Sequence, residues 1–266
     1  IREKINEHFI ANNHGVDPDS IDLLEYGGLV MVGDVEKFYE FAIFMLIYDL
    51  NDPANYDSVK TWLDIDNFID YFAVEIYTNN GDWLGNNVRY WRERKDGAKW
   101  RYILWDLDFG FSNWNPPSFN GLQWTIDKAC DSISNPWYCI ENGPFFDFHA
   151  EIFAKLLLEN INFRNAFINR YADLTNTIFT PAYFSALVYQ FRDTLDAEMP
   201  RQFERWGGGF YEYEFGSPGR GSYDDWINFN IPDLISNNAN RQIFARQHVQ
   251  QVFNLKQQIP VTLNVN

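Results

Sequence analysis

The chain has 266 residues, of which 46% are hydrophobic and 18% aromatic, enough for one large domain or two small ones. Its formal net charge of −16 argues against nucleic acid as a partner. The charge would favour the approach of basic substrates, although a charge that keeps the protein soluble is the commoner explanation. No apolar run approaches the ~18 residues of a membrane span, so none is predicted. Because the chain begins at Ile1 and not at Met, we expect it to be part of a longer protein.

The first third of the chain is predicted to contain short helices and two short strands. A helix that Asp34 would cap carries apolar residues on one face, and Asn51-Asp52-Pro53 should end it. The last helix of this region runs directly into a polar loop that starts at Asn79, so burial of its apolar face would fix that loop. The predicted helices cover residues 2–12, 34–50, 57–63 and 67–77, and the predicted strands cover 21–24 and 29–32.

A β-hairpin follows the polar loop. Residues 88–92 and 100–105 are rich in aromatic and β-branched residues, as strands prefer. Between them stands Lys95-Asp96-Gly97, and Asp-Gly between two such runs is a strong hairpin signal. Antiparallel pairing would bring the start of the first strand beside the end of the second.

Carboxylate and amide groups stand at both ends of this hairpin. Asp82, Asn86 and Asn87 precede the first strand, and Asp106 and Asp108 follow the second. We expect these five side chains to form an oxygen-rich pocket, which suits hard cations such as Mg²⁺. The alternative is that the first cluster is turn chemistry and the second is the exposed end of a strand.

The order of these residues matches the acidic parts of protein kinases. In kinases a catalytic-loop Asp accepts the hydroxyl proton, an Asn further along holds Mg²⁺, and the Asp of a DFG motif also holds Mg²⁺. Here Asp82 is followed by Asn87, and Asp108-Phe109-Gly110 supplies the DFG. Either motif alone can occur by chance in an acidic chain, whereas the two in this order around a hairpin favour a kinase-type site.

The runs NNGDWLGNNVRYW (79–91) and WDLDFGF (105–111) resemble the CotH family, the atypical secreted kinases related to spore-coat protein H. The resemblance implies an α+β fold, mostly α-helical with a short antiparallel β-hairpin, similar to the larger lobe of a protein kinase. It also implies Mg²⁺- or Mn²⁺-dependent transfer of the ATP γ-phosphate to Ser or Thr of secreted or surface proteins, at a bacterial cell surface or spore coat. It extends to residues 2–24, 198–201, 205–207 and 240–248.

The same resemblance implies roles for particular residues. No glycine-rich loop followed by a strand lysine precedes the polar loop, so the parts that hold the nucleotide phosphates are expected upstream of Ile1 or are replaced. Glu3 could orient such a lysine, or it could be an ordinary helix-surface residue. The implied set is Asp82 and Asp106 for catalysis, Asp108, Asn87 and Asp106 for the metal, and Asn86, Asn87, Arg89 and Glu3 for the cofactor.

Residues 112–144 are expected to be irregular, and a loop of this length is usually functional or disordered. Cys130 and Cys139 lie in it, and the sequence allows either a disulfide or two free thiols. Its aromatic residues would contact the acceptor protein or pack the loop onto the domain. They are Trp114, Trp124, Trp137 and Tyr138.

The remainder is predicted to be helical, over residues 145–159, 162–177, 181–199 and 231–253. A kinase-type domain would then cover 1–256, and 257–266 would begin a β module or tail. The alternative function is that of a non-catalytic surface module that binds glycans or protein partners through its aromatic residues.

Overall fold

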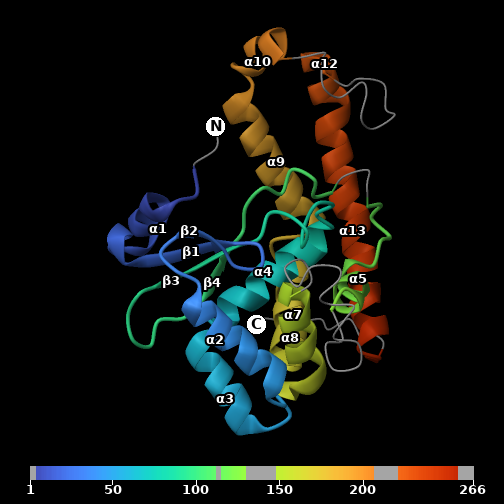
Figure 1. The fold of residues 1–266 in the computed structure, drawn as a ribbon. Helices are drawn as coiled ribbons and strands as arrows, with labels where there is room; N and C mark the ends of the chain where they lie inside the picture. Colours follow the sequence, from blue (N-terminus) through green and yellow to red (C-terminus); the bar gives the residue numbers. More distant parts are fainter. Residues whose placement is uncertain (1–3, 112–114, 130–147, 207–220, 257–266) are drawn as a thin grey trace, which may run out of the picture. The chain divides into compact units, whose positions relative to one another are not determined.

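The structure is a computed structural model that describes residues 4–111, 115–129, 148–206 and 221–256 (Figure 1). It is mostly helical with one small antiparallel sheet, which confirms the predicted α+β class. The chain forms two compact units. The N-terminal unit consists of residues 1–114 and 120–171, and the C-terminal unit consists of 115–119 and 172–266. The likeness to the larger lobe of a kinase and the domain border at residue 256 stay predictions.

The sheet has four strands in the order β2-β1-β3-β4, all antiparallel. Strands β3 (Arg89–Glu93) and β4 (Arg101–Ile103) form the predicted hairpin, in which Gly97 takes a φ of +73°. Strands β1 (Ile21–Glu25) and β2 (Leu29–Val32) lie where the sequence predicts them. The pairing of β1 with β3 was not predicted, and it fastens the hairpin to the first part of the chain.

The two faces of the sheet carry different cores. Helix α1 (Glu7–His14) begins after Asn6, whose side chain accepts a hydrogen bond from the Phe9 N–H, and ends at Gly15 in the left-handed conformation. Figure 1 shows this helix beside β1. Its buried Ile10 belongs to a cluster with Ile5, Ile21, Leu23, Trp91 and Ile103.

Aromatic residues cover the opposite face of the sheet. The ring of Tyr90 lies 4.5 Å from Phe38 of α2 (Glu36–Ile47), and that of Tyr102 lies 5.0 Å from Phe68. His149 of α7 (Phe148–Glu159) is fully buried and bonded at both ring nitrogens, to the Tyr102 hydroxyl and to the Tyr26 carbonyl, each at 2.7 Å. Burial lowers the pKa of His149 to about 4, so the ring is neutral at pH 7 and fixes the β1–β2 turn.

Helix α4 (Ile65–Thr78) is the central element of the N-terminal unit. Asp64 caps it by accepting a hydrogen bond from the Asn67 N–H, and most of its residues are buried. Phe72 stacks on Phe153 of α7 at 4.4 Å, and Phe153 in turn lies 5.1 Å from Phe167 of α8 (Ile161–Asn176). A large share of the abundant aromatic residues therefore builds this core.

Several predicted boundaries are wrong, each for a local reason. Helix α3 (Pro53–Trp62) begins earlier than predicted, because Asp52 caps it and Pro53 occupies its first position; these residues start a helix as well as ending one. The N-cap of α2 is Val35 and not Asp34, although the Asp34 carboxylate accepts a hydrogen bond from the Glu36 N–H. An additional helix, α5 (Gly121–Asp127), lies in the stretch expected to be irregular, and Asn120 caps it.

The C-terminal unit contains α9 (Pro181–Leu195), α10 (Met199–Trp206), α12 (Tyr223–Asp225), a π-helical turn (Trp226–Asn230) and α13 (Ile231–Val252), with α13 packed against α9. The predicted helix 181–199 is wrong at its end, where a turn separates α9 from α10. Buried Arg241 donates to the carbonyls of Pro117 and Phe119, at 3.0 and 2.8 Å. No helix in the described part of the chain is long and apolar enough to cross a membrane.

Candidate active site

The loop that carries Asp82 is fixed by the end of α4. Asn79 caps the helix in the left-handed conformation, with a φ of +52°, and its N–H bonds back to the carbonyls of Glu75 and Ile76. Beyond it, Trp83 is buried, and its indole N–H donates to the Tyr71 hydroxyl at 2.9 Å. A buried helix and a buried tryptophan thus hold the two sides of Asp82.

Two asparagines orient the Asp82 carboxylate. Its Oδ2 accepts a hydrogen bond from Asn87 Nδ2 at 2.8 Å and a longer one from Asn86 Nδ2 at 3.4 Å. Asn86 is itself held by the Tyr26 hydroxyl, which donates to Asn86 Oδ1 at 2.8 Å. The other oxygen, Asp82 Oδ1, is buried and has no hydrogen-bond partner among the residues that the structure describes.

The segment with the second acidic cluster forms a tight turn beside this loop. Asp106 has a φ of +56°, and the Gly110 N–H bonds to the Leu107 carbonyl at 2.9 Å. Two backbone hydrogen bonds join the segments: Gly81 N–H to the Phe109 carbonyl at 3.3 Å, and Phe111 N–H to the Thr78 carbonyl at 2.7 Å. A Cβ at Gly110 would lie 3.2 Å from Cβ of Thr78, so the two segments are in close contact.

The two acidic clusters therefore meet, as the hairpin predicts. Burial raises the pKa of Asp82, and the nearby charge of Asp108 raises it further, while the hydrogen bonds from Asn86 and Asn87 lower it. Asp108 is exposed and Asp106 is half-buried. The two segments that carry the five predicted side chains lie side by side, and the roles of these side chains in catalysis, metal binding and nucleotide binding stay predictions.

Glu75 and Asn80, like Tyr26, belong to this region and were not singled out from the sequence. Glu75 of α4 is completely buried, and its Oε2 accepts a hydrogen bond from Asn80 Nδ2 at 3.1 Å. The same Nδ2 lies 3.4 Å from the Asp106 carbonyl oxygen. The sequence does contain a signal for Glu75, because an ionisable residue on the apolar face of a helix is unusual and calls for an explanation.

Glu75 is expected to make the stability of the protein depend on pH. Burial, aided by the charge of Asp82, raises the pKa of Glu75 from 4.5 to about 8. Between these values the folded protein holds a proton that the unfolded chain has released, so the free energy of unfolding falls as pH rises. Glu75→Gln, which cannot ionise, should remove this dependence. Urea denaturation should show the variant gaining on wild type between about pH 5 and pH 8; a constant difference would contradict the pKa shift.

Arg89, predicted to bind the cofactor, has structural contacts. Its guanidinium pairs with Glu25 Oε1 at 3.0 Å and lies 3.7 Å from the centre of the Trp105 ring. The ion pair holds β3 to β1, and the contact with Trp105 holds β3 to the segment after β4. Glu3, Cys130 and Cys139 lie outside the described residues, as do Trp114, Trp137, Tyr138 and residues 257–266. Trp124 is half-buried with its ring 6.4 Å from that of Trp83, a contact expected of the packing alternative.

The described residues contain no group of three or more His, Cys, Asp and Glu side chains placed to hold a metal ion. Nucleotide-bound Mg²⁺ usually takes only one or two protein carboxylates, with water and substrate phosphates as its other ligands. The oxygen donors of Asn87 and Asp108 fit such a site, because Asn87 is hydrogen-bonded to Asp82 and the charge of Asp108 acts on the same carboxylate. Asp106 precedes Asp108 by two positions and is a further candidate oxygen donor.

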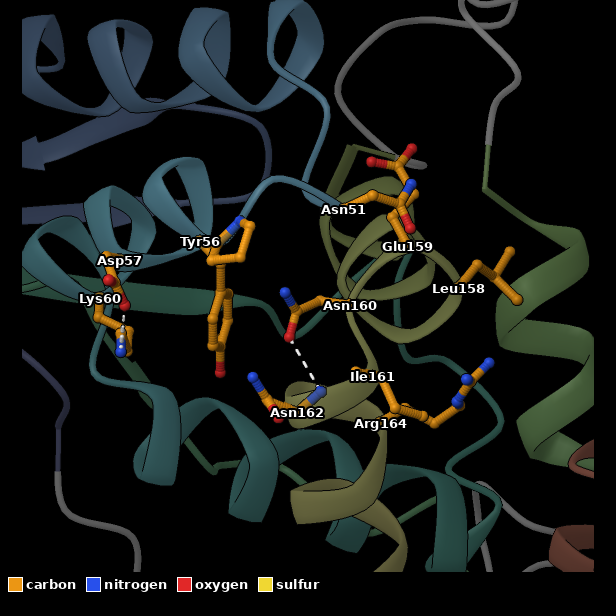
Figure 2. Close-up of a pocket in the computed structure, with 11 residues that line it drawn as sticks. Asn51, Tyr56, Asp57, Lys60, Leu158, Glu159, Asn160, Ile161, Asn162 and Arg164 are labelled. Carbon is orange, nitrogen blue, oxygen red and sulfur yellow. Dashed lines mark hydrogen bonds and ion pairs between the residues drawn. The ribbon is translucent and has the colours of Figure 1, made fainter.

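A surface pocket of about 220 Å³ lies away from these residues, between α3 and the junction of α7 with α8 (Figure 2). Several of its polar groups have structural partners. Lys60 pairs with Asp57 at 2.6 Å, Glu159 accepts a hydrogen bond from the Leu50 N–H, and Asn160 caps α8. We therefore assign this pocket no part in the chemistry.

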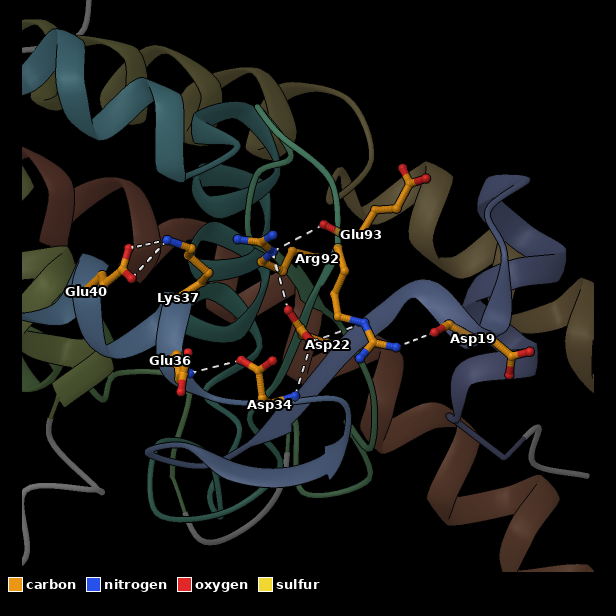
Figure 3. A network of polar contacts seen from close by, with 9 residues as sticks. Asp19, Asp22, Asp34, Glu36, Lys37, Glu40, Arg92 and Glu93 are labelled. Atoms are coloured by element: carbon orange, nitrogen blue, oxygen red, sulfur yellow. Dashed lines mark hydrogen bonds and ion pairs between the residues drawn. The ribbon is translucent and has the colours of Figure 1, made fainter.

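A second polar cluster surrounds Asp22 of β1 (Figure 3). Asp22 is 1% exposed, accepts a hydrogen bond from the Asp34 N–H at 3.1 Å and pairs with Arg92 at 3.5 Å and Arg94 at 3.7 Å. Gly33 has a φ of +78°, and a Cβ there would overlap Asp22 Oδ1. The cluster ties the segment after β2 to β1 and β3, which is a structural role.

Comparison with known proteins identifies a protein family. A family model described as CotH kinase protein matches residues 2–229, which include both acidic clusters and the whole sheet. No curated protein matches the chain, and no solved structure matches it.

Proposed function

This chain belongs to the CotH kinase protein family, and from that premise we propose that it transfers the γ-phosphate of ATP to Ser or Thr residues of secreted or surface proteins. Membership in a kinase family implies ATP and a divalent cation in general terms. The dependence on Mg²⁺ or Mn²⁺, the acceptor class and a location at the cell surface or spore coat are parts of the proposal.

The observation that carries the proposal is the junction of the two acidic segments. Two backbone hydrogen bonds fix the loop of Asp82 against the turn of Asp108, and the charges of the two carboxylates interact. Phosphoryl transfer needs mainly positioning and electrostatic stabilisation from the protein. Asp82 is partly buried and Asp108 is exposed. This difference supports separate roles, with Asp82 as the base and Asp108 as a ligand of the cation.

In the proposed reaction Asp82 accepts the proton of the acceptor hydroxyl, or orients that hydroxyl towards the phosphate. Asn86 and Asn87 donate hydrogen bonds to its Oδ2 and so fix the orientation of the carboxylate. The raised pKa of Asp82 makes it a stronger base than an exposed Asp. Asp106 is the second candidate for this role.

Asp108, Asn87 and Asp106 would hold the cation. A bound divalent cation neutralises charge on the phosphates that it bridges. Asp108 is exposed, as a ligand to an ion that arrives with a nucleotide must be. Arg89 and Glu3 stay in the proposal only as the family resemblance implies them. The contacts that Arg89 makes to Glu25 and Trp105 support a structural role instead.

The proposal is tested by incubating the full-length protein with γ-labelled ATP, Mg²⁺ or Mn²⁺, and a basic Ser-rich acceptor. We expect label on Ser or Thr that depends on the metal. The net charge of −16 should help the protein to attract a basic acceptor. Label that appears equally with EDTA, or a complete lack of transfer with either metal, would contradict it. The second outcome would favour the alternative of a non-catalytic binding module.

A further inference from the structure

We propose that Glu75 and Asn80 are positioning residues that hold Asp82 in register with the segment of Asp106 and Asp108. They act through the backbone and do not touch the reacting groups. The inference rests on the proposed function. It identifies the hydrogen bonds that align the loop of Asp82 with the segment of Asp106 and Asp108.

The geometry points to Asn80 as the link. Asn80 stands two positions before Asp82, is 3% exposed, and directs one amide nitrogen towards two acceptors. These are Glu75 Oε2 at 3.1 Å and the Asp106 carbonyl at 3.4 Å. One side chain of the Asp82 loop is therefore tied both to the core helix α4 and to the second acidic segment.

Glu75 is suited to hold this amide without disturbing the site. It is fully buried on a helix face otherwise made of residues such as Phe72 and Ile76, where a carboxyl group is costly. Its Oε1 has no hydrogen-bond partner in the described part of the chain. The charge of Asp82 on the loop raises the pKa of Glu75, and the charge of ionised Glu75 in turn raises the pKa of Tyr71 on α4, for which burial is the larger cause. Because its pKa is about 8, Glu75 offers an acceptor oxygen at neutral pH and adds no negative charge beside the aspartates.

The backbone conformation of the second acidic segment has to be stabilised by contacts with its surroundings. Asp106 has a φ of +56° and Phe111 one of +53°, conformations that non-glycine residues adopt at a cost and that surrounding contacts must maintain. The hydrogen bond from Asn80 holds the carbonyl of Asp106 itself. A displacement of about 1 Å between reacting groups can lower a rate about 10²-fold, so a small relaxation here would matter.

The test compares Glu75→Ala, Asn80→Ala and Glu75→Gln in the full-length protein. For the two alanine variants we expect kcat to fall about 10- to 100-fold, with the KM for ATP changed less than about threefold. Rates are taken per nucleotide-binding site, so that unfolded protein does not count. Glu75→Gln should keep kcat within about threefold of wild type, because the amide keeps an acceptor oxygen at the same place.

The matched control is Asp66→Asn, which removes an exposed carboxylate from the first turn of the same helix and should leave kcat unchanged.

Hydrogen exchange supplies a measurement that does not depend on activity. In Asn80→Ala the amides of Gly81 and Phe111, which join the two segments, should lose protection, while those of β3 keep it. Glu75→Gln should leave both amides protected. Wild-type kcat in both alanine variants, equal losses in Glu75→Gln and Glu75→Ala, or unchanged protection at Gly81 and Phe111 would each overturn the positioning role. If the wild-type protein transfers no phosphate, the proposed function fails, and the exchange experiment alone decides the positioning role.

Discussion

Asp82→Asn is expected to lower kcat by about 10²- to 10⁴-fold, the usual contribution of a general base, while Mg²⁺–ATP still binds. The amide keeps the shape of the side chain and can accept the hydrogen bonds that Asn86 and Asn87 donate to Asp82 Oδ2. It cannot accept the proton of the acceptor hydroxyl. Steady-state kinetics with a protein acceptor would measure the loss, and calorimetry would measure nucleotide affinity.

The matched control is Asp96→Asn, in the exposed turn of the hairpin, which removes the same charge outside the site. It should leave kcat unchanged. If Asp82→Asn transfers phosphate at the wild-type rate, Asp82 is turn chemistry, and Asp106 becomes the next candidate for the base.

Asp108→Asn is expected to weaken nucleotide binding and turnover together. We expect at least about a tenfold loss of affinity for Mg²⁺–ATP, or about 1.4 kcal/mol, because a carboxylate ligand of the cation is lost. The change should cost little stability, since Asp108 is exposed and the turn is held by backbone hydrogen bonds. Removal of its charge should also lower the pKa of Asp82, which Asp108 raises.

Calorimetry at several Mg²⁺ concentrations measures this effect, and thermal denaturation shows whether the variant is folded. A variant that binds Mg²⁺–ATP as the wild type does, yet turns over slowly, would place Asp108 in catalysis and not in cation binding.

The parts of the fold with local signals could be predicted from the sequence. Asp-Gly at residues 96–97 marks the hairpin, and the apolar period of residues 67–77 marks the helix that supports the site. The pairing of β1 with β3 could not be predicted, because it joins Glu25 to Arg89 across most of the N-terminal unit and leaves no local pattern.

The sequence predicted that the two acidic segments lie together, and the structure shows which contacts join them. The hairpin does bring the two clusters together, but the direct ties run between the loops, from Gly81 to Phe109 and from Phe111 to Thr78. Tyr26, Glu75 and Asn80 were missed, since each acts through a partner distant in sequence or one helical turn away. Of these three, only Glu75 could be recognised from the sequence, as an ionisable residue on the apolar face of a predicted helix.

The most direct test of the central claim, that the two acidic clusters form one metal–nucleotide site, is calorimetric titration of the full-length protein with ATP, with Mg²⁺ and with EDTA. We predict that affinity rises with Mg²⁺ in the wild type, and that this gain is lost in Asp108→Asn but kept in Asp82→Asn. Equal affinity in EDTA and in Mg²⁺, or an equal gain from Mg²⁺ in all three proteins, would contradict the assignment of Asp108 to the cation.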